Sequence, residues 1–211
     1  RIHCVIYDCD GVLFDSLEAN TKLYNDLCAL VGRGPMREEE VKYVHTHTVF
    51  EALHFIFGKE DDLEKKALEA LKQKQIDLKD YVSYLNMEPN LLQALEELKG
   101  RGIRRAINTN RTTSMKYIME RFNLWPFFDM VVTALDVKNP KPHPESVDKI
   151  VQKFNLHKEE AVFVGDSEGF ARRDEAERYR QLLQNLRPDQ WDMERFLPGQ
   201  ARREAAAARE A

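Results

Sequence analysis

Two carboxylates stand two residues apart in the run Val5-Ile6-Tyr7-Asp8-Cys9-Asp10-Gly11-Val12, where a short apolar stretch ends. Side chains alternate in direction along a strand, but at a turn both acids can point toward one ligand or metal ion. Gly11 allows the backbone to bend closely around such a group. In proteins of alternating strands and helices, the carboxyl end of a strand is where ligands bind. The alternative is a polar strand end followed by a tight turn, and this run alone leaves both open.

Three later segments carry residues suited to binding an oxyanion. Ala106-Ile107-Asn108-Thr109-Asn110 ends an apolar stretch in a hydroxyl, Lys141 lies among the prolines of 139–144, and Val162-Phe163-Val164-Gly165-Asp166-Ser167 ends in an acid. Each has an ordinary alternative: Thr109 can begin a helix, Lys141 can be a solvated surface residue, and Asp166 can cap a turn. The order of all four segments is more informative than any one of them.

In this order the segments resemble the motifs of the haloacid dehalogenase-like superfamily, over residues 2 to about 167. The resemblance implies that Asp8 is a nucleophile and Asp10 a general acid and base. It implies that Thr109 and Lys141 bind and stabilise a phosphoryl group. Carboxylates are recognised covalent catalysts of this kind, and a phosphoryl transition state needs its spread charge neutralised.

The same resemblance implies a bound Mg²⁺. Its ligands would be the carboxylates of Asp8 and Asp166 and the backbone carbonyl of Asp10, with Ser167 orienting Asp166. Oxygen ligands without thiols or paired histidines favour Mg²⁺ over zinc. The chain departs from many relatives at Phe170, where they carry a second acid.

Further residues are candidates for binding the substrate. Gly11 would let the backbone bend closely around the expected phosphate, and the backbone N–H groups at Asn110 and beyond would open toward it ahead of a helix. Arg111 could bind an anionic group. In relatives with a helical cap, the turn between its second and third helices reaches over the site. Here that turn holds His45 and His47, which could bind a sugar hydroxyl or a carboxylate, or could be incidental to a surface helix junction.

The elements after the first strand are predicted to be helices. Beyond Asp15 the apolar period changes from two to three or four, and Asp15 with Glu18 has capping-box spacing. We expect one helix to end near 32–35, and others at about 37–44, 48–57 and 60–79. This block resembles the cap of the phosphoglycolate phosphatase and β-phosphoglucomutase branch.

Strands and helices then alternate. Expected strands lie at 103–109, 129–134 and 161–165, with amphipathic helices near 91–100, 115–122 and 144–154. Short apolar strands alternating with such helices indicate an α/β fold, with a Rossmann-like parallel sheet covered on both faces. We therefore predict a catalytic core of 1–14 and 87–167, an inserted helical cap domain of 15–86, and an atypical helical tail of 168–211.

The tail differs in composition from the rest of the chain. Every Lys lies at or before Lys158, and residues 168–211 contain no Val, Ile or Thr, so helices at 172–186 and 201–211 are expected instead of a further strand. The tail is either a divergent extension or a segment not adjacent to the core in a parent protein. It could support self-association.

Composition excludes several classes of function. The formal net charge is -4, with no long basic run in the first three quarters of the chain, so nucleic acid is not an expected partner. No apolar stretch approaches the width of a bilayer, and we expect a soluble, cytoplasmic protein that does not bind membranes. Cys4, Cys9 and Cys28 are expected to be reduced, buried thiols.

Together these observations predict a Mg²⁺-dependent enzyme under a mobile helical cap. It would hydrolyse a small phosphorylated metabolite, a phosphate monoester of the phosphoglycolate or sugar phosphate type, through an aspartyl-phosphate on Asp8. One alternative is a phosphomutase of the β-phosphoglucomutase type, which returns the phosphoryl group to a sugar. The other is a non-catalytic binding or scaffold protein on the same fold.

Overall fold

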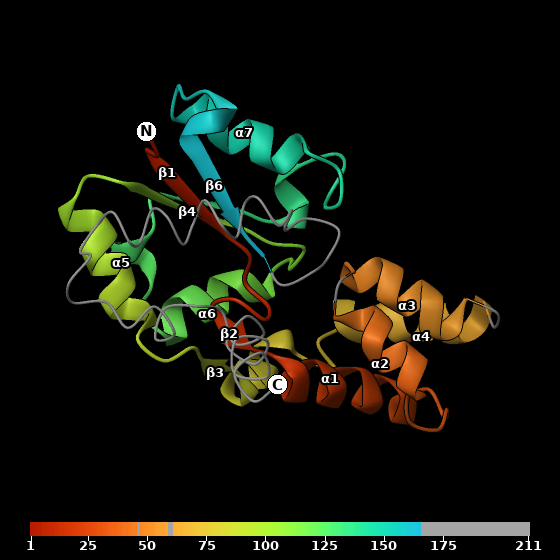
Figure 1. Ribbon diagram of the computed structural model, residues 1–211. Coiled ribbons are helices and arrows are strands. Elements are labelled where there is room, and N and C mark those ends of the chain that lie inside the picture. The colour runs from red at the N-terminus through yellow and green to blue at the C-terminus, as the bar shows by residue number, and fades with distance from the viewer. Residues whose placement is uncertain (46, 59–60, 166–211) are drawn as a thin grey trace, which may run out of the picture. The chain divides into compact units, whose positions relative to one another are not determined.

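The computed structural model describes residues 1–45, 47–58 and 61–165, and the chain forms two compact units (Figure 1). The first, the sheet unit, consists of Arg1–Asp15, Met87–Thr109 and Trp125–Ala211, the last described up to Gly165. The second, the helical unit, consists of Ser16–Asn86 and Asn110–Leu124. The helical unit is thus made of two insertions into the chain of the sheet unit.

The sheet unit is built on a parallel sheet of the order β5-β4-β1-β6 (Figure 1). Its strands are β1 (Cys4–Tyr7), β4 (Arg104–Asn108), β5 (Met130–Val132) and β6 (Ala161–Val164). All residues of β1 and β6 are buried, which explains why both read as unbroken apolar runs. The predicted α/β class with a Rossmann-like parallel sheet is confirmed.

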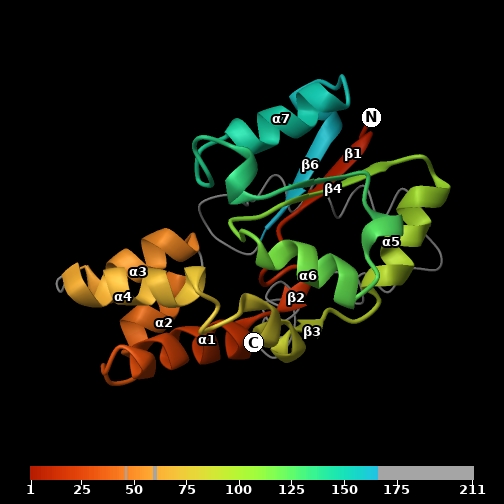
Figure 2. The same ribbon diagram turned by 180° about the vertical axis from the view of Figure 1, so that it is seen from behind.

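Helices cover both faces of this sheet, with α7 (Glu145–Lys153) on one side and α5 (Leu91–Gly100) on the other (Figure 2). Residues of α7 share an apolar cluster with alternate strand residues, among them Ile6, Ala106 and Phe163. The buried residues of α5 recur at helical spacing: Leu91, Ala94, Leu95 and Leu98. Coverage on both faces keeps water from the sheet except at its ends.

The helical unit has its own core. Its helices are α1 (Leu17–Leu30), α2 (Glu38–Val44), α3 (Val49–Phe57), α4 (Asp61–Lys72), the 3₁₀ segment η1 (Leu78–Tyr84) and α6 (Ser114–Arg121). α2 packs on α3, α3 on α4, and α1 and α6 both contact η1. The residues buried in this core include Leu27, Leu53, Phe57 and Ala67.

Several short elements join these. β2 (Phe14–Asp15) and β3 (Asn86–Met87) lie where the chain passes from one unit to the other, and η2 (Trp125–Phe127), η3 (Ala134–Asp136) and η4 (Lys158–Glu160) are single 3₁₀ turns. The side chain of Thr133 accepts a hydrogen bond from the Leu135 N–H and so caps η3. Local caps of this kind satisfy backbone groups that a single turn leaves unpaired.

Two local predictions were wrong. The helix expected at 60–79 ends at Lys72, because Lys74 takes a positive φ of 54° that an α-helix cannot continue, and η1 follows. The capping box expected from Asp15 is absent: Ser16 precedes α1, and its side chain makes no capping hydrogen bond. Spacing alone does not show which polar residue ends up at the helix start.

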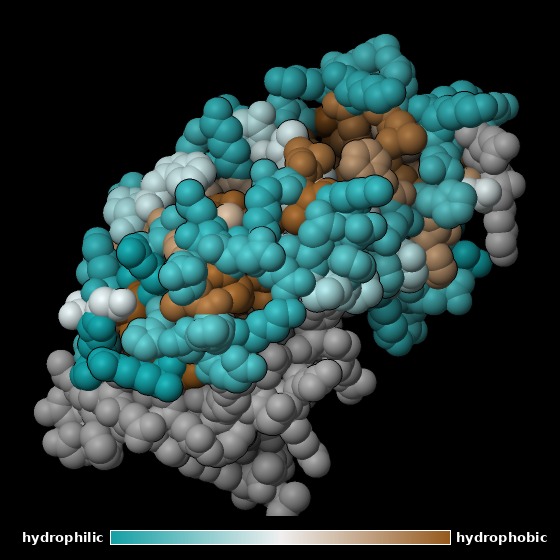
Figure 3. Space-filling view, turned by 90° about the horizontal axis from the view of Figure 1, so that it is seen from above, coloured by the Kyte–Doolittle hydropathy of each residue, from teal (hydrophilic) through white to brown (hydrophobic). Residues whose placement is uncertain are grey.

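Hydrophilic side chains cover much of the face seen in Figure 3, with apolar side chains visible between them. Within the described ranges, no helix combines the length and apolar character that a bilayer crossing requires. Cys4, Cys9 and Cys28 are buried thiols that form no disulfide, as expected. The helices predicted at 172–186 and 201–211 lie outside the described residues.

Candidate active site

The turn after β1 carries the two aspartates. The ladder with β6 extends through Asp8, whose N–H donates to the Val164 carbonyl at 2.8 Å. Gly11 then adopts a φ of 72°, in the left-handed region that favours glycine, and its N–H donates to the Phe14 carbonyl at 2.8 Å. This tight turn holds Asp8 and Asp10 at the carboxyl end of a buried strand.

Asp8 is paired with a lysine from a distant loop. Lys141 Nζ lies 2.6 Å from Oδ2 of Asp8, and the two side chains are 9% and 12% exposed. The second carboxylate oxygen, Oδ1, accepts a hydrogen bond of 2.7 Å from the Cys9 N–H. Lys141 is therefore not a solvated surface residue, which was its alternative interpretation.

The electrostatic balance at Asp8 depends on this pair. Burial raises the pKa of Asp8 above its ordinary value, and the nearby negative charge of Asp10 acts in the same direction. The ammonium of Lys141 and the N–H of Cys9 oppose that rise. A buried carboxylate without a counter-ion would take up a proton, so Lys141 favours the ionised form that a nucleophile needs.

Thr109 follows the neighbouring strand. β1 and β4 run in register from Cys4 with Arg104 to Tyr7 with Ile107, so Asp8 and Thr109 leave the sheet at the same edge. Thr109 is 2% exposed, and its N–H donates to the Val132 carbonyl at 3.0 Å. Because α6 begins only at Ser114, Thr109 does not cap that helix. The sheet unit thus brings Asp8, Asp10, Thr109 and Lys141 to one end of its sheet.

In the helical unit, three polar side chains form a connected chain. Arg111 donates to Oδ1 of Asn20 at 3.4 Å, and Nδ2 of Asn20 lies 3.3 Å from Nδ1 of His45. His45 directly follows α2, and Asn20 lies in the second turn of α1. A guanidinium and an imidazole linked by an amide form a group that can bind an anion or a hydroxyl.

His47 contacts Tyr43. Its Nδ1 is 2.9 Å from the Tyr43 carbonyl oxygen, and its ring stacks on the Tyr43 ring with centroids 3.7 Å apart. Phe55 stacks on the same tyrosine at 3.9 Å. His45 is thus joined to Arg111 through Asn20, and His47 to Tyr43.

A model of the haloacid dehalogenase-like hydrolase family matches residues 5–170. The chain belongs to this family. The match covers all four segments, from Asp8 through Thr109 and Lys141 to Asp166, and confirms the family predicted from their order.

Known members of the haloacid dehalogenase-like family resemble most of the chain. A protein named pyrophosphatase PpaX from Bacillus cereus is 27% identical over 169 residues, which are 79% of this chain and 76% of that protein. A solved HAD-superfamily hydrolase of subfamily IA from Geobacter sulfurreducens is 38% identical, with a TM-score of 0.67 and coverage of 80% and 81%. The β-phosphoglucomutase from Clostridium difficile has a TM-score of 0.68 at 18% identity, covering 79% and 77%, and shares the fold. The family model therefore makes the chain a haloacid dehalogenase-like hydrolase.

The described part of the site fits the Mg²⁺ that this family generally uses. All of its donors are oxygens, and Asp8 and Asp10 together carry more negative charge than the one ammonium of Lys141 balances. The third predicted ligand, Asp166, lies outside the described residues, as do Ser167 and Phe170. Within 1–45, 47–58 and 61–165, no three acidic, histidine or cysteine side chains gather as a metal site.

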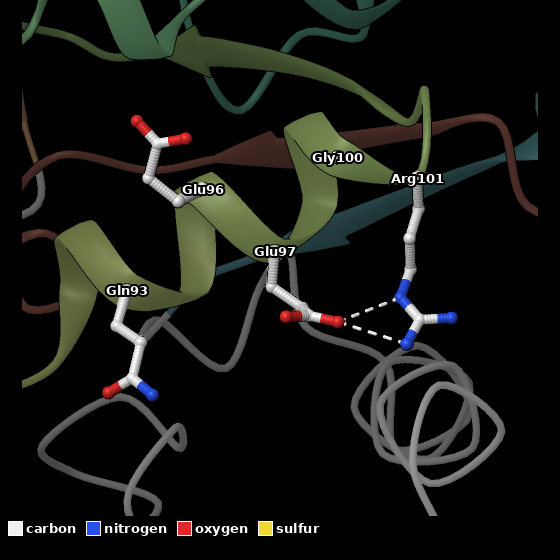
Figure 4. Close-up of a pocket in the computed structure, with 5 residues that line it drawn as sticks. All are labelled: Gln93, Glu96, Glu97, Gly100 and Arg101. Carbon is white, nitrogen blue, oxygen red and sulfur yellow. Dashed lines mark hydrogen bonds and ion pairs between the residues drawn. The ribbon is translucent and has the colours of Figure 1, made fainter.

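A surface depression on α5 is a poor alternative for the active site of a haloacid dehalogenase-like enzyme. It is lined by Gln93, Glu96, Glu97, Gly100 and Arg101, all on or next to one helix (Figure 4). Figure 4 shows Arg101 turned to Glu97, and their ion pair measures 2.9 Å. Catalytic sites bring together groups from several elements, as the carboxyl end of the sheet does.

Sequence reasoning missed Asn20 and Asn108. Asn20 lies on α1, directly beyond the aspartate turn, and its only signal was a polar residue early in that helix. Asn108 stands in the predicted apolar strand, and this polar residue is only 1% exposed. An amide inside a run of buried strand residues is a signal that could have been used.

Proposed function

We propose that this protein is a Mg²⁺-dependent phosphatase that hydrolyses a small phosphate monoester through an aspartyl-phosphate on Asp8. The observation that carries the proposal is the buried ion pair of Asp8 with Lys141 at the carboxyl end of the sheet. A buried, ionised carboxylate beside a fixed ammonium can attack phosphorus while the ammonium stabilises the phosphoryl oxygens.

In the first step, a carboxylate oxygen of Asp8 forms a bond to phosphorus as the bond from phosphorus to the ester oxygen breaks. Asp10 gives its proton to that leaving oxygen, which departs as an alcohol. Lys141 and the hydroxyl of Thr109 hold the phosphoryl oxygens while charge builds on them. Asp10 suits this role because it stands two residues after Asp8 in the same tight turn, where its carboxyl can reach the leaving oxygen.

In the second step, Asp10 takes a proton from a water that attacks phosphorus. The bond from phosphorus to Asp8 breaks, inorganic phosphate leaves, and Asp8 returns to its carboxylate form. Asp8, the Asp10 carbonyl and Asp166 would hold Mg²⁺, which would neutralise charge on a dianionic phosphate.

The helical unit provides substrate selection. Arg111, Asn20 and His45 present a guanidinium and hydrogen-bonding atoms suited to a carboxylate, a second phosphate or a sugar hydroxyl. Relatives and structural neighbours are named as a pyrophosphatase and a β-phosphoglucomutase, so substrates with a second polar group come first in the test.

The proposal is tested by phosphate release from phosphoglycolate, pyrophosphate, glucose 1-phosphate and p-nitrophenyl phosphate, with and without Mg²⁺. Wild type is compared with Asp8→Asn and with Asp62→Asn, an exposed carboxylate of α4 that serves as the matched control. We expect Mg²⁺-dependent turnover that only Asp8→Asn abolishes. Equal rates in all three proteins would refute the proposal, and interconversion of sugar phosphates without phosphate release would identify a mutase instead.

A further inference from the structure

Asn108 is an unexpected residue for its place in the sheet. It ends β4, a strand inside a parallel sheet with helices on both faces, where apolar residues are the rule. It is 1% exposed, and within the described part of the chain neither Nδ2 nor Oδ1 of its side chain makes a hydrogen bond. A buried amide with donor and acceptor both unsatisfied lowers the stability of the folded state, so its presence calls for an explanation.

The register of the strands brings Asn108 beside Asp8. β1 and β4 pair from Cys4 with Arg104 through Tyr7 with Ile107, and the next positions in the same register are Asp8 and Asn108. Both residues are still held in the sheet by their other neighbours: the Asp8 N–H donates to the Val164 carbonyl of β6, and Asn108 pairs with Val132 of β5. Neighbouring strands lie about 4.8 Å apart, so the two backbones are adjacent.

The two side chains also share a face of the sheet. Ile6 and Ala106 belong to the cluster that packs under α7, and residues two positions further along each strand point to the same side. Asp8 and Asn108 are those residues. Phe163, in the same cluster, has Lys141 Nζ 5.8 Å from its ring, so the ammonium is on this face as well.

We propose that Asn108 is a positioning residue for the Asp8 and Lys141 pair, and that its amide is engaged only while the phosphoryl group is transferred. The inference rests on the proposed function. As Asp8 bonds to phosphorus, its charge passes to the phosphoryl oxygens, and the ammonium moves its hydrogen bond from Oδ2 to them. The side-chain Nδ2–H of Asn108 then donates to the carbonyl oxygen that remains on Asp8, and the side-chain Oδ1 of Asn108 accepts a hydrogen bond from Lys141.

Such an arrangement speeds the chemical step for a general reason. An interaction that is made in the transition state and not in the free enzyme raises kcat, whereas one made in both states lowers KM. The amide of Asn108 is already desolvated, so no water has to leave it when the reaction begins. The instability of the free state and the gain in rate have the same origin.

The test compares Asn108→Leu with wild type. Removing an unsatisfied buried amide should stabilise the folded state. For a chain of this length we expect Tm to rise by about 2–4 °C. The same change should lower kcat about 10- to 100-fold, as loss of an orienting partner does, with KM nearly unchanged. A purely structural residue cannot produce a more stable and slower enzyme with the same KM.

Ser146→Ala is the matched control. Ser146 is 2% exposed at the start of α7, and its Oγ likewise makes no hydrogen bond within the described residues. Its replacement should raise Tm and leave kcat alone. Asn108→Ala provides the same comparison if the larger leucine prevents folding.

Three results would overturn the inference. The first is a wild-type kcat in both Asn108→Leu and Asn108→Ala. The second is a fall of both Tm and kcat in the two variants, which would show a structural role. A wild type without phosphatase activity would overturn the proposed function and this inference with it. An active wild type with equally active Asn108 variants overturns the inference alone.

Discussion

Lys141 Nζ lies 2.6 Å from Oδ2 of Asp8, and both side chains are almost fully withdrawn from solvent. Asp8 is fixed by the end of the central strand β1, while Lys141 comes from the loop before α7. Two opposite charges that are removed from water interact far more strongly than the same charges at a surface. The pair therefore links the fold of the sheet unit to the reactivity of its nucleophile.

Replacing Lys141 by methionine keeps the length of the side chain and removes its charge. We expect kcat to fall about 100- to 1,000-fold, because the developing charge on the phosphoryl oxygens loses its ammonium. Steady-state phosphate release measures this. Lys153→Met, at an exposed position of α7, should retain the wild-type rate. Unreduced kcat in Lys141→Met would contradict the role given to the pair.

The strand ends of the site could be predicted from the sequence because each apolar run stops at a polar residue. Asp8 and Thr109 were assigned in this way, and their strands end where expected. Parallel strands put their carboxyl ends on one edge, which explains why distant segments meet. Lys141 came only from the resemblance to the family, since a lysine in a proline-rich loop has no periodic signal.

Other parts of the structure depend on tertiary packing that no short pattern contains. Asn20 becomes a candidate only when α1, the loop that holds Arg111 and the residue after α2 come together. The end of α4 is set by the backbone of Lys74, for which spacing gave no warning. Asn108 stands in an apolar run, and only the three-dimensional structure shows that its buried side-chain amide makes no hydrogen bond within the described residues.

Arg111→Ala tests substrate selection. Loss of a charged hydrogen-bond donor costs about 1.5–3 kcal/mol, so KM for a substrate with a second anionic group should rise about 10- to 100-fold. The KM for p-nitrophenyl phosphate, which lacks that group, should change little. Arg121→Ala, at an exposed position on the following helix α6, should affect neither. An equal rise for both substrates would exclude selection by Arg111.

Glu40 makes the stability of the helical unit depend on pH. Its side chain is fully buried and pairs with Arg33 at 2.5 Å and with Arg37 at 2.8 Å. Burial would raise its pKa, but hydrogen bonds from Arg37 and Arg33 outweigh this, and the pKa lies below the ordinary 4.5. A carboxyl with a lowered pKa adds stability above its unfolded-state value, and the contribution is lost as the pH falls through its folded value.

We therefore expect Glu40→Gln to lower the free energy of unfolding by about 2–3 kcal/mol at neutral pH, somewhat less than for a fully buried pair, because Arg37 is mostly exposed. The difference should shrink as the pH falls below 4.5. Urea unfolding across this range measures it. Glu39→Gln is the control, since Glu39 meets Arg37 at the surface. A difference that stays constant with pH would contradict the linkage.

The most direct test of the account is to trap the phosphorylated enzyme. Asp10→Asn should form the aspartyl-phosphate with p-nitrophenyl phosphate, whose leaving group needs little protonation, but should release it slowly because the water lacks its base. Acid quenching followed by mass spectrometry of the peptide from 1–15 should then find a phosphoryl group on Asp8, and none in Asp8→Asn. A phosphoryl group on another residue, or the same turnover in Asp8→Asn as in wild type, would contradict the account.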